Sequence, residues 1–107
     1  MKTDLIEIFQ TIRAELQPYA TLGFTNRINS EEVYDLWSEK NIKEEHVTER
    51  FFAAVKIEDG RVVLQYADER AEGKGRIEVT KLDELQLSKI QDQIAITHTA
   101  FKEHEWV

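Results

Sequence analysis

The chain contains no cysteine, and this absence removes several kinds of chemistry at once. A protein without cysteine has no disulfide bonds, no thiolate metal ligands and no thiol nucleophile. The absence also fits a reducing compartment, so we expect a cytoplasmic protein. The length of 107 residues suits one domain with its own hydrophobic core, which we expect to span residues 1–107.

Long apolar runs are missing as well, and basic residues are scarce. The first segment, MKTDLIEIFQ, meets an acidic residue at Asp4, and no later segment approaches the roughly 20 apolar residues that a membrane-spanning helix needs. The 14 lysines and arginines are outnumbered by 21 aspartates and glutamates, which gives a net charge of −7. Such a chain repels a phosphate backbone. We therefore expect neither a membrane nor a nucleic acid as a partner.

Familiar catalytic motifs are also absent. No GxSxG motif occurs, and no serine has an evident histidine and acid arrangement. The GKGR stretch, residues 73–76, lacks the GxxxxGK[ST] frame of a phosphate loop and precedes an expected strand rather than a helix. The sequence therefore leans against an enzyme without excluding one, and it predicts no cofactor.

The two ends of the chain have the apolar spacing of amphipathic helices. A helix over about residues 4–17 is predicted by capping-box spacing of Asp4 and Glu7, by Pro18 as a stop, and by an apolar stripe: Leu5, Ile8, Phe9, Ile12 and Leu16. A second helix over about residues 82–103 is predicted by the stripe Leu87, Ile90, Ile94 and Phe101.

The middle of the chain has strand patterns. Residues 51–57 and 61–66 are strand-length runs around a turn that ends in Asp59-Gly60, and residues 76–80 alternate in the same way. EVYDLW fits either a helix or a strand, and its aromatic and β-branched content favours a strand. Residues 23–28 could add a short edge strand, and residues 38–49 form a loop. We predict an α+β two-layer sandwich: an antiparallel sheet of about four to five strands with the N-terminal and C-terminal helices on one face.

Alternation along the hairpin predicts which side chains lie on the face without helices. Phe51, Ala53, Val55 and Ile57 should point to the helices, and Phe52, Ala54 and Lys56 away from them. The candidate ligand or partner surface is then Trp37, Phe52 and Val63 with Asp35 beside them. Alternatively, Trp106 or the 38–49 loop folds over this surface.

Acidic residues offer weak metal-binding patterns. Glu45, His46 and Glu49 could share one helical face and hold a divalent ion, although the sequence lacks the HExxH pattern. Asp4, Glu7 and Glu15, with Glu31 and Glu32, could form an acidic ridge that attracts hard cations. Solvation of a helix explains these carboxylates equally well.

Several segments together resemble a known group of proteins. These are YDLWSEK, FFAAVKI, RVVLQY and GKGRIEVTKLDE, at residues 34–40, 51–57, 61–66 and 73–84. In this order they are similar to the small uncharacterised bacterial domains of the YdhG-like group, one branch of which is described as frataxin-like iron chaperones. The resemblance implies a strand at YDLW, and in the iron-chaperone branch it implies iron held by surface carboxylates. Between residues 66 and 73 the chain is shorter than the group's pattern, so any pocket lid formed there would be missing or reduced.

Two functional hypotheses follow. The first is a non-catalytic binding or interaction module that uses the aromatic sheet face to hold an unknown protein or small molecule, as a monomer or homodimer. It predicts that Trp37→Ala and Phe52→Ala leave the fold largely intact. The alternative, which rests on the resemblance, is an acidic iron chaperone that binds ferrous iron weakly through surface carboxylates.

Overall fold

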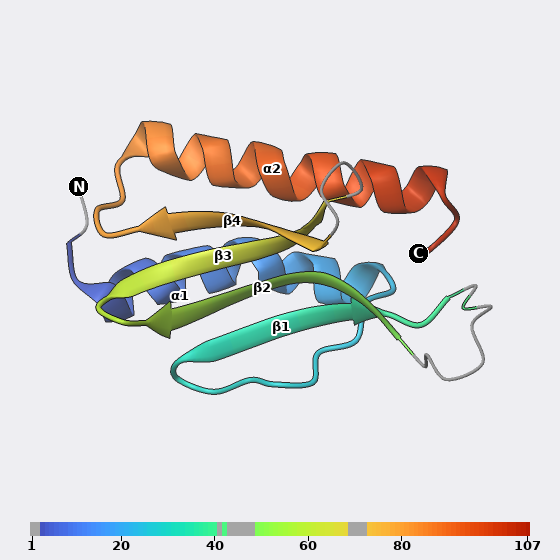
Figure 1. Cartoon of the computed structure of the whole chain (residues 1–107), viewed down its shortest axis with the longest axis horizontal. Coiled ribbons are helices and arrows are strands. Elements are labelled where there is room, and N and C mark those ends of the chain that lie inside the picture. Colours follow the sequence, from blue (N-terminus) through green and yellow to red (C-terminus); the bar gives the residue numbers. More distant parts are fainter. Residues whose placement is uncertain (1–2, 41, 43–48, 69–72) are drawn as a thin grey trace.

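The protein is an α+β structure in which two helices enclose four consecutive strands in the sequence. The computed structural model describes residues 3–40, 42, 49–68 and 73–107. Its elements are α1 (Leu5–Leu16), the 3₁₀ helix η1 (Gln17–Leu22), β1 (Val33–Ser38), β2 (Arg50–Glu58), β3 (Arg61–Asp68), β4 (Gly73–Val79) and α2 (Glu84–Glu103); Figure 1 labels all of them except η1. The strands form one antiparallel sheet in the order β1-β2-β3-β4. The predicted architecture is confirmed, with four strands.

Each long helix begins at an aspartate that caps its first backbone N–H groups. The Asp4 carboxylate accepts the N–H of Ile6 at 2.8 Å, and the Asp83 carboxylate accepts the N–H of Gln86 at 2.7 Å. A side-chain acceptor at this position satisfies a donor that has no partner inside the helix. These caps explain why α1 and α2 begin at Leu5 and Glu84.

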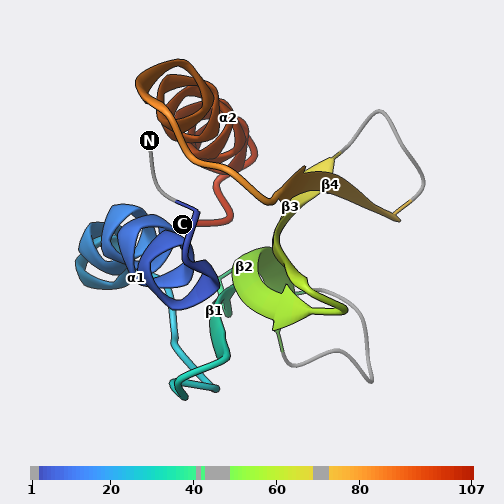
Figure 2. The ribbon, with the colours of Figure 1, turned by 90° about the vertical axis from the view of Figure 1, so that its left-hand side faces the viewer.

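Both helices cover the same face of the sheet. Figure 2 shows α1 and α2 next to each other on one side, and no helix of the described chain lies against the opposite side, which we call the open face. Helix α1 packs on β2 and β3, and α2 packs on β3, β2 and α1. The core between the layers includes Ile8, Phe9, Ile12, Leu16, Leu36, Val55, Leu64, Ile90, Ile94 and Phe101.

A tight turn joins β2 to β3, as the sequence predicts. Asp59 and Gly60 both have positive φ, 50° and 76°, between the paired residues Glu58 and Arg61. Two left-handed residues give the turn the twist of the strands that flank it, and glycine adopts that conformation without steric cost.

The segment before β1 pairs with it only at isolated points. Thr25 and Trp37 exchange backbone hydrogen bonds of 2.7 and 2.8 Å, and a second bridge joins Asn29 to Tyr34. The edge strand predicted for residues 23–28 is therefore present as single bridges and not as a fifth strand. These bridges cover the outer edge of β1.

A β-bulge in β2 reverses the predicted direction of its first residues. In the register with β1, Leu36 pairs with Ala53 and Trp37 pairs with Phe51, so Phe52 is an extra residue without a partner. A bulge of this kind places two successive side chains on one face. Phe52 and Ala53 both join the core, and Phe51 packs on Trp37 at the open face. The prediction that Phe51 points to the helices and Phe52 away from them is wrong.

The C-terminal residues pack on the helix side of the sheet. The Trp106 ring lies 5.2 Å from the Phe101 ring, and the Arg50 guanidinium stacks 4.2 Å from the centre of the Trp106 ring. The Ser38 hydroxyl donates a hydrogen bond to the Trp106 carbonyl. Trp106 therefore does not cover the open face, and most of the 38–49 loop lies outside the described residues.

Candidate functional site

The centre of the open face is covered by charged side chains rather than open to a ligand. Val63 has no exposed surface although no helix covers it. Around it lie ion pairs from Arg61 to Glu78 at 2.8 Å and from Arg76 to Glu78 at 3.0 Å, and Arg76 also reaches Glu58 at 3.3 Å. Hydrogen bonds from Arg61 and Arg76 hold the pKa of the Glu78 carboxyl below its ordinary value. Val63 is thus a packing residue beneath a charged network.

Asp35 is a structural residue, because its carboxylate is occupied by neighbouring donors. One oxygen accepts the backbone N–H of Arg27 and of Ile28, at 2.9 and 2.8 Å, and the other accepts the Trp37 indole N–H at 2.9 Å. Asp35 is only 4% exposed. A buried carboxylate with this many donors holds the segment before β1 in place.

Trp37 is half-buried, whereas the other three predicted surface residues are buried. Its ring lies 5.3 Å from the Phe51 ring, with the Arg27 guanidinium 5.8 Å from the Trp37 ring and the Lys74 ammonium 4.2 Å from the Phe51 ring. Both aromatic rings therefore already have a cation–π partner within the protein. The predicted surface therefore separates: Trp37 and Asp35 contact each other, Val63 is covered, and Phe52 lies in the core.

The predicted metal site has no supporting geometry in the described part of the chain. Glu45 and His46 lie outside the described residues, and Glu49 forms an ion pair with Arg27. Among the described residues, no three histidine, aspartate or glutamate side chains come together as a metal site would require. In the predicted acidic ridge, Asp4 caps α1 and Glu15 accepts a hydrogen bond from Gln91.

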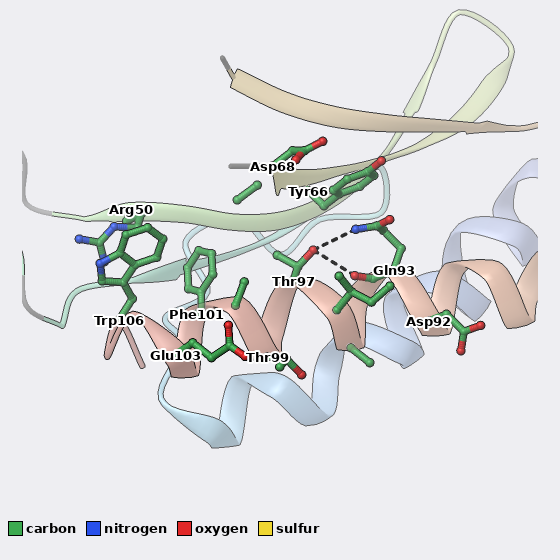
Figure 3. A pocket seen from close by; sticks show the side chains of 14 residues that line it. Arg50, Tyr66, Asp68, Asp92, Gln93, Thr97, Thr99, Phe101, Glu103 and Trp106 are labelled. Carbon is green, nitrogen blue, oxygen red and sulfur yellow. Dashed lines mark hydrogen bonds between the residues drawn. The ribbon is translucent and has the colours of Figure 1, made fainter. Parts of the chain in front are cut away.

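The helix-covered side contains a different candidate site, an open pocket between α2 and the end of β3 that we call the α2 groove (Figure 3). Its volume is about 1030 Å³, at the upper end of the range for ligand sites. It is lined by Arg50, Tyr66, Ala67, Asp68, Asp92, Gln93, Ala95, Ile96, Thr97, Thr99, Ala100, Phe101, Glu103 and Trp106. The α2 residues from Asp92 to Glu103 cover three helical turns, or about 16 Å.

A cross-strand pair of unequal size produces the groove. Tyr66 on β3 pairs with Gly75 on β4, and its ring lies so close that a Cβ at Gly75 would be 2.1 Å from the tyrosine Cε2 atom. The ring therefore occupies the place of the missing side chain and lies flat on the sheet. The space between this ring and α2 is left open.

The floor of the groove behaves as an apolar surface. Thr97 is buried, but its hydroxyl donates to the Gln93 carbonyl at 3.0 Å and accepts from the Gln93 side-chain amide at 3.2 Å, as the dashed lines in Figure 3 show. Among the described residues, no buried side-chain polar atom lacks a hydrogen-bond partner. The groove thus offers apolar contact without an unsatisfied polar group.

The rim of the groove is acidic, and one large aliphatic side chain on it is exposed. Among the described lining residues, Asp68, Asp92 and Glu103 are acidic and Arg50, at the Trp106 end, is the one cation (Figure 3). Ile96 is 62% exposed although it lines the groove. No histidine, serine or lysine is among the lining residues that the structure describes.

Comparison of the chain with protein-family models, with curated proteins and with solved structures found no match. The resemblance to the YdhG-like group therefore stays a prediction. Neither helix in the described part of the chain combines the length and the apolar character needed to cross a lipid bilayer.

Proposed function

We propose that the protein is a non-catalytic binding module of the cytoplasm whose α2 groove receives a basic, amphipathic segment of a partner protein. The observation that carries the proposal is the groove itself, which exposes Ile96 above an apolar floor and has three carboxylates on its rim. Amphipathic helices commonly bind by laying an apolar face into such a groove. The three-turn length of the α2 wall matches such a segment better than a compact small molecule.

Charge favours a basic occupant. The described part of the rim has three carboxylates and one arginine, and the whole chain has a net charge of −7. Charge complementarity speeds association and excludes acidic segments. The iron-chaperone alternative stays a prediction, because the described residues give it no ligand set.

A fluorescence titration tests this proposal directly. Trp106 lines the groove, and the chain has only one other tryptophan, so the Trp37→Phe variant makes Trp106 the single reporter. The probe is a 14-residue leucine and lysine peptide with a helical apolar stripe. We expect a saturable change in Trp106 emission. A peptide with glutamate in place of lysine, and one with the same residues in scrambled order, should not produce it.

Matched isoleucine variants show whether the groove is the binding site. Ile96 and Ile6 are 62% and 58% exposed on different helices, and only Ile96 lines the groove. Covering the exposed part of Ile96 contributes about 1–2 kcal/mol, so Ile96→Asn should weaken binding by about 5- to 30-fold. Ile6→Asn should leave the affinity within about twofold. Equal losses in both variants, or equal binding of the scrambled peptide, would show that the attraction is not at the groove.

Gly75→Ala provides a second test without changing the rim. The added Cβ displaces the Tyr66 ring, and the space next to the ring is the groove. We expect weaker peptide binding with little change in stability, because the atoms in conflict are at the far end of a tyrosine side chain. Unchanged affinity would place the peptide elsewhere.

A further inference from the structure

The two edges of the sheet differ in a way that points to a second copy of the chain. The outer edge of β1 is bridged by Thr25 and Asn29, whereas in the described part of the chain no strand or bridge pairs with the outer edge of β4. Backbone groups alternate along an antiparallel strand, so half of those in β4 point away from β3. Such an edge is a template for another strand.

The shape of β4 leaves this edge suited to pairing. Its register with β3 runs without a shift from Val79 to Gly73, and it contains no proline. Bulges and prolines are the usual devices that prevent edge pairing, although charged side chains also serve. Here the charges themselves become complementary in one register.

We propose that β4 pairs antiparallel with β4 of a second copy around a two-fold axis at Ile77, which joins the two sheets into one of eight strands. In this register Arg76 lies opposite Glu78 of the other copy, twice, and Gly75 lies opposite Val79. Opposite charges directly across a strand pair are stabilising, and like charges are destabilising. An axis at Arg76 would place the two Arg76 side chains against each other, and an axis at Glu78 would do the same for the two carboxylates.

The helix side of the junction also fits a second copy. Ile77 is half-buried and would meet its equivalent there. On α2, Gln91 contacts α1 and His98 contacts η1. Ile96 is about 140–160° away from these two residues around the helix, so it lies on the flank toward β4. Leu85, 67% exposed, shares this flank. Large apolar side chains exposed beside an unpaired strand edge favour an interface.

The spacing of the layers allows the two α2 helices to meet. Strands in a sheet are about 4.8 Å apart, so the two copies of β3 would be about 14 Å apart across the junction. Helix α2 packs on β3, and a helix with its side chains is about 10–12 Å wide. The two α2 helices therefore lie next to each other above the joined sheet. The pairing does not depend on an occupant of the groove.

Cysteine cross-linking tests both the pairing and its register, because the chain has no native thiol. Ile77→Cys places two thiols directly opposite each other, and Arg76→Cys, on the more exposed neighbouring position, places each thiol opposite Glu78. Under mild oxidation we expect Ile77→Cys to form a covalent dimer at least tenfold faster than Arg76→Cys. If the disulfide formed by random collisions between chains, Arg76→Cys would cross-link faster than Ile77→Cys, because its thiol is the more exposed of the two.

The mass of the unmodified protein is the independent measurement. Light scattering over a concentration series should rise from the chain mass of 12.6 kDa toward twice that value. This result does not depend on whether a cysteine variant folds. A constant mass of one chain up to millimolar concentration would overturn the proposal. A dimer in which Arg76→Cys cross-links as fast as Ile77→Cys would overturn the Ile77 register.

Discussion

Replacement of Phe52 by alanine is the strongest test of the packing described above, because sequence alternation predicted this side chain on the open face. Phe52 has no exposed surface, and its ring stacks on Phe24 at 4.0 Å and meets Phe101 edge-on at 5.1 Å. Truncation of a core phenylalanine costs about 3–5 kcal/mol. The loss of two aromatic contacts places this site near the upper end. We therefore expect Phe52→Ala to lower the free energy of unfolding by about 4–5 kcal/mol, a large part of the roughly 5–15 kcal/mol typical of a domain.

The neighbouring Phe51→Ala variant is the matched control. Phe51 is half-buried on the open face, against Trp37 and Lys74, so its loss should cost about 1–2 kcal/mol. Urea unfolding followed by far-UV circular dichroism gives both free energies of unfolding, provided that the slope of this free energy against urea concentration is unchanged. If Phe51→Ala is as destabilising as Phe52→Ala, the bulge and the resulting direction of Phe52 are wrong.

Two further predictions concern a buried and a half-buried polar side chain. Asp35→Asn places an amide donor among the N–H groups of Arg27, Ile28 and Trp37, and should lower the free energy of unfolding by about 2–3 kcal/mol. Replacement at an exposed position, Asp92→Asn, should change the free energy of unfolding by less than about 0.5 kcal/mol. Equal shifts of the urea midpoint in the two variants would refute a structural role for Asp35. Burial, with a smaller contribution from Lys102, lowers the pKa of His98 below its ordinary value of 6.5, so the unfolded chain takes up the proton first and stability should fall as the pH drops below about 6.5. His98→Gln should reduce this fall in urea midpoints measured from about pH 8 to about pH 5, and parallel profiles for the two proteins would exclude His98 as its cause.

Helices and the hairpin could be predicted because their signals are local. The apolar stripe of α1 repeats every three or four residues behind a capping aspartate, and the β2–β3 turn needs only the adjacent pair Asp59-Gly60. Each signal lies within one element and does not depend on which segments later become neighbours. The two-layer architecture could then be predicted, because two amphipathic helices need a sheet face on which to bury their apolar sides.

The direction of Phe52 could not be predicted in this way. Because side chains alternate along a strand, the face to which one side chain points fixes the face of all the others. A bulge reverses these faces for every residue beyond it. The bulge is defined by pairing with β1, where Trp37 takes Phe51 as its partner. Asp35 was misjudged for a similar reason, because two of its hydrogen-bond donors, the N–H groups of Arg27 and Ile28, belong to the segment before β1.

The α2 groove depends on a pair of residues nine positions apart, Tyr66 and Gly75, which only the β3–β4 register brings together. GKGR drew attention in the sequence as a loop motif, but the role of Gly75 is to admit the tyrosine ring. A glycine inside a strand weakens it, and β4 is also the strand with an outer edge that the described residues leave unpaired. The groove and the edge therefore both involve β4, but Gly75 shapes only the groove. Gly75→Ala should close the groove, because its Cβ displaces Tyr66, and should leave the β4 pairing intact, because Gly75 faces Val79 of the second copy across the junction. A variant that loses peptide binding and keeps the dimer mass would thus show that the β4 pairing does not require the open groove, although Ile96 lies beside both surfaces.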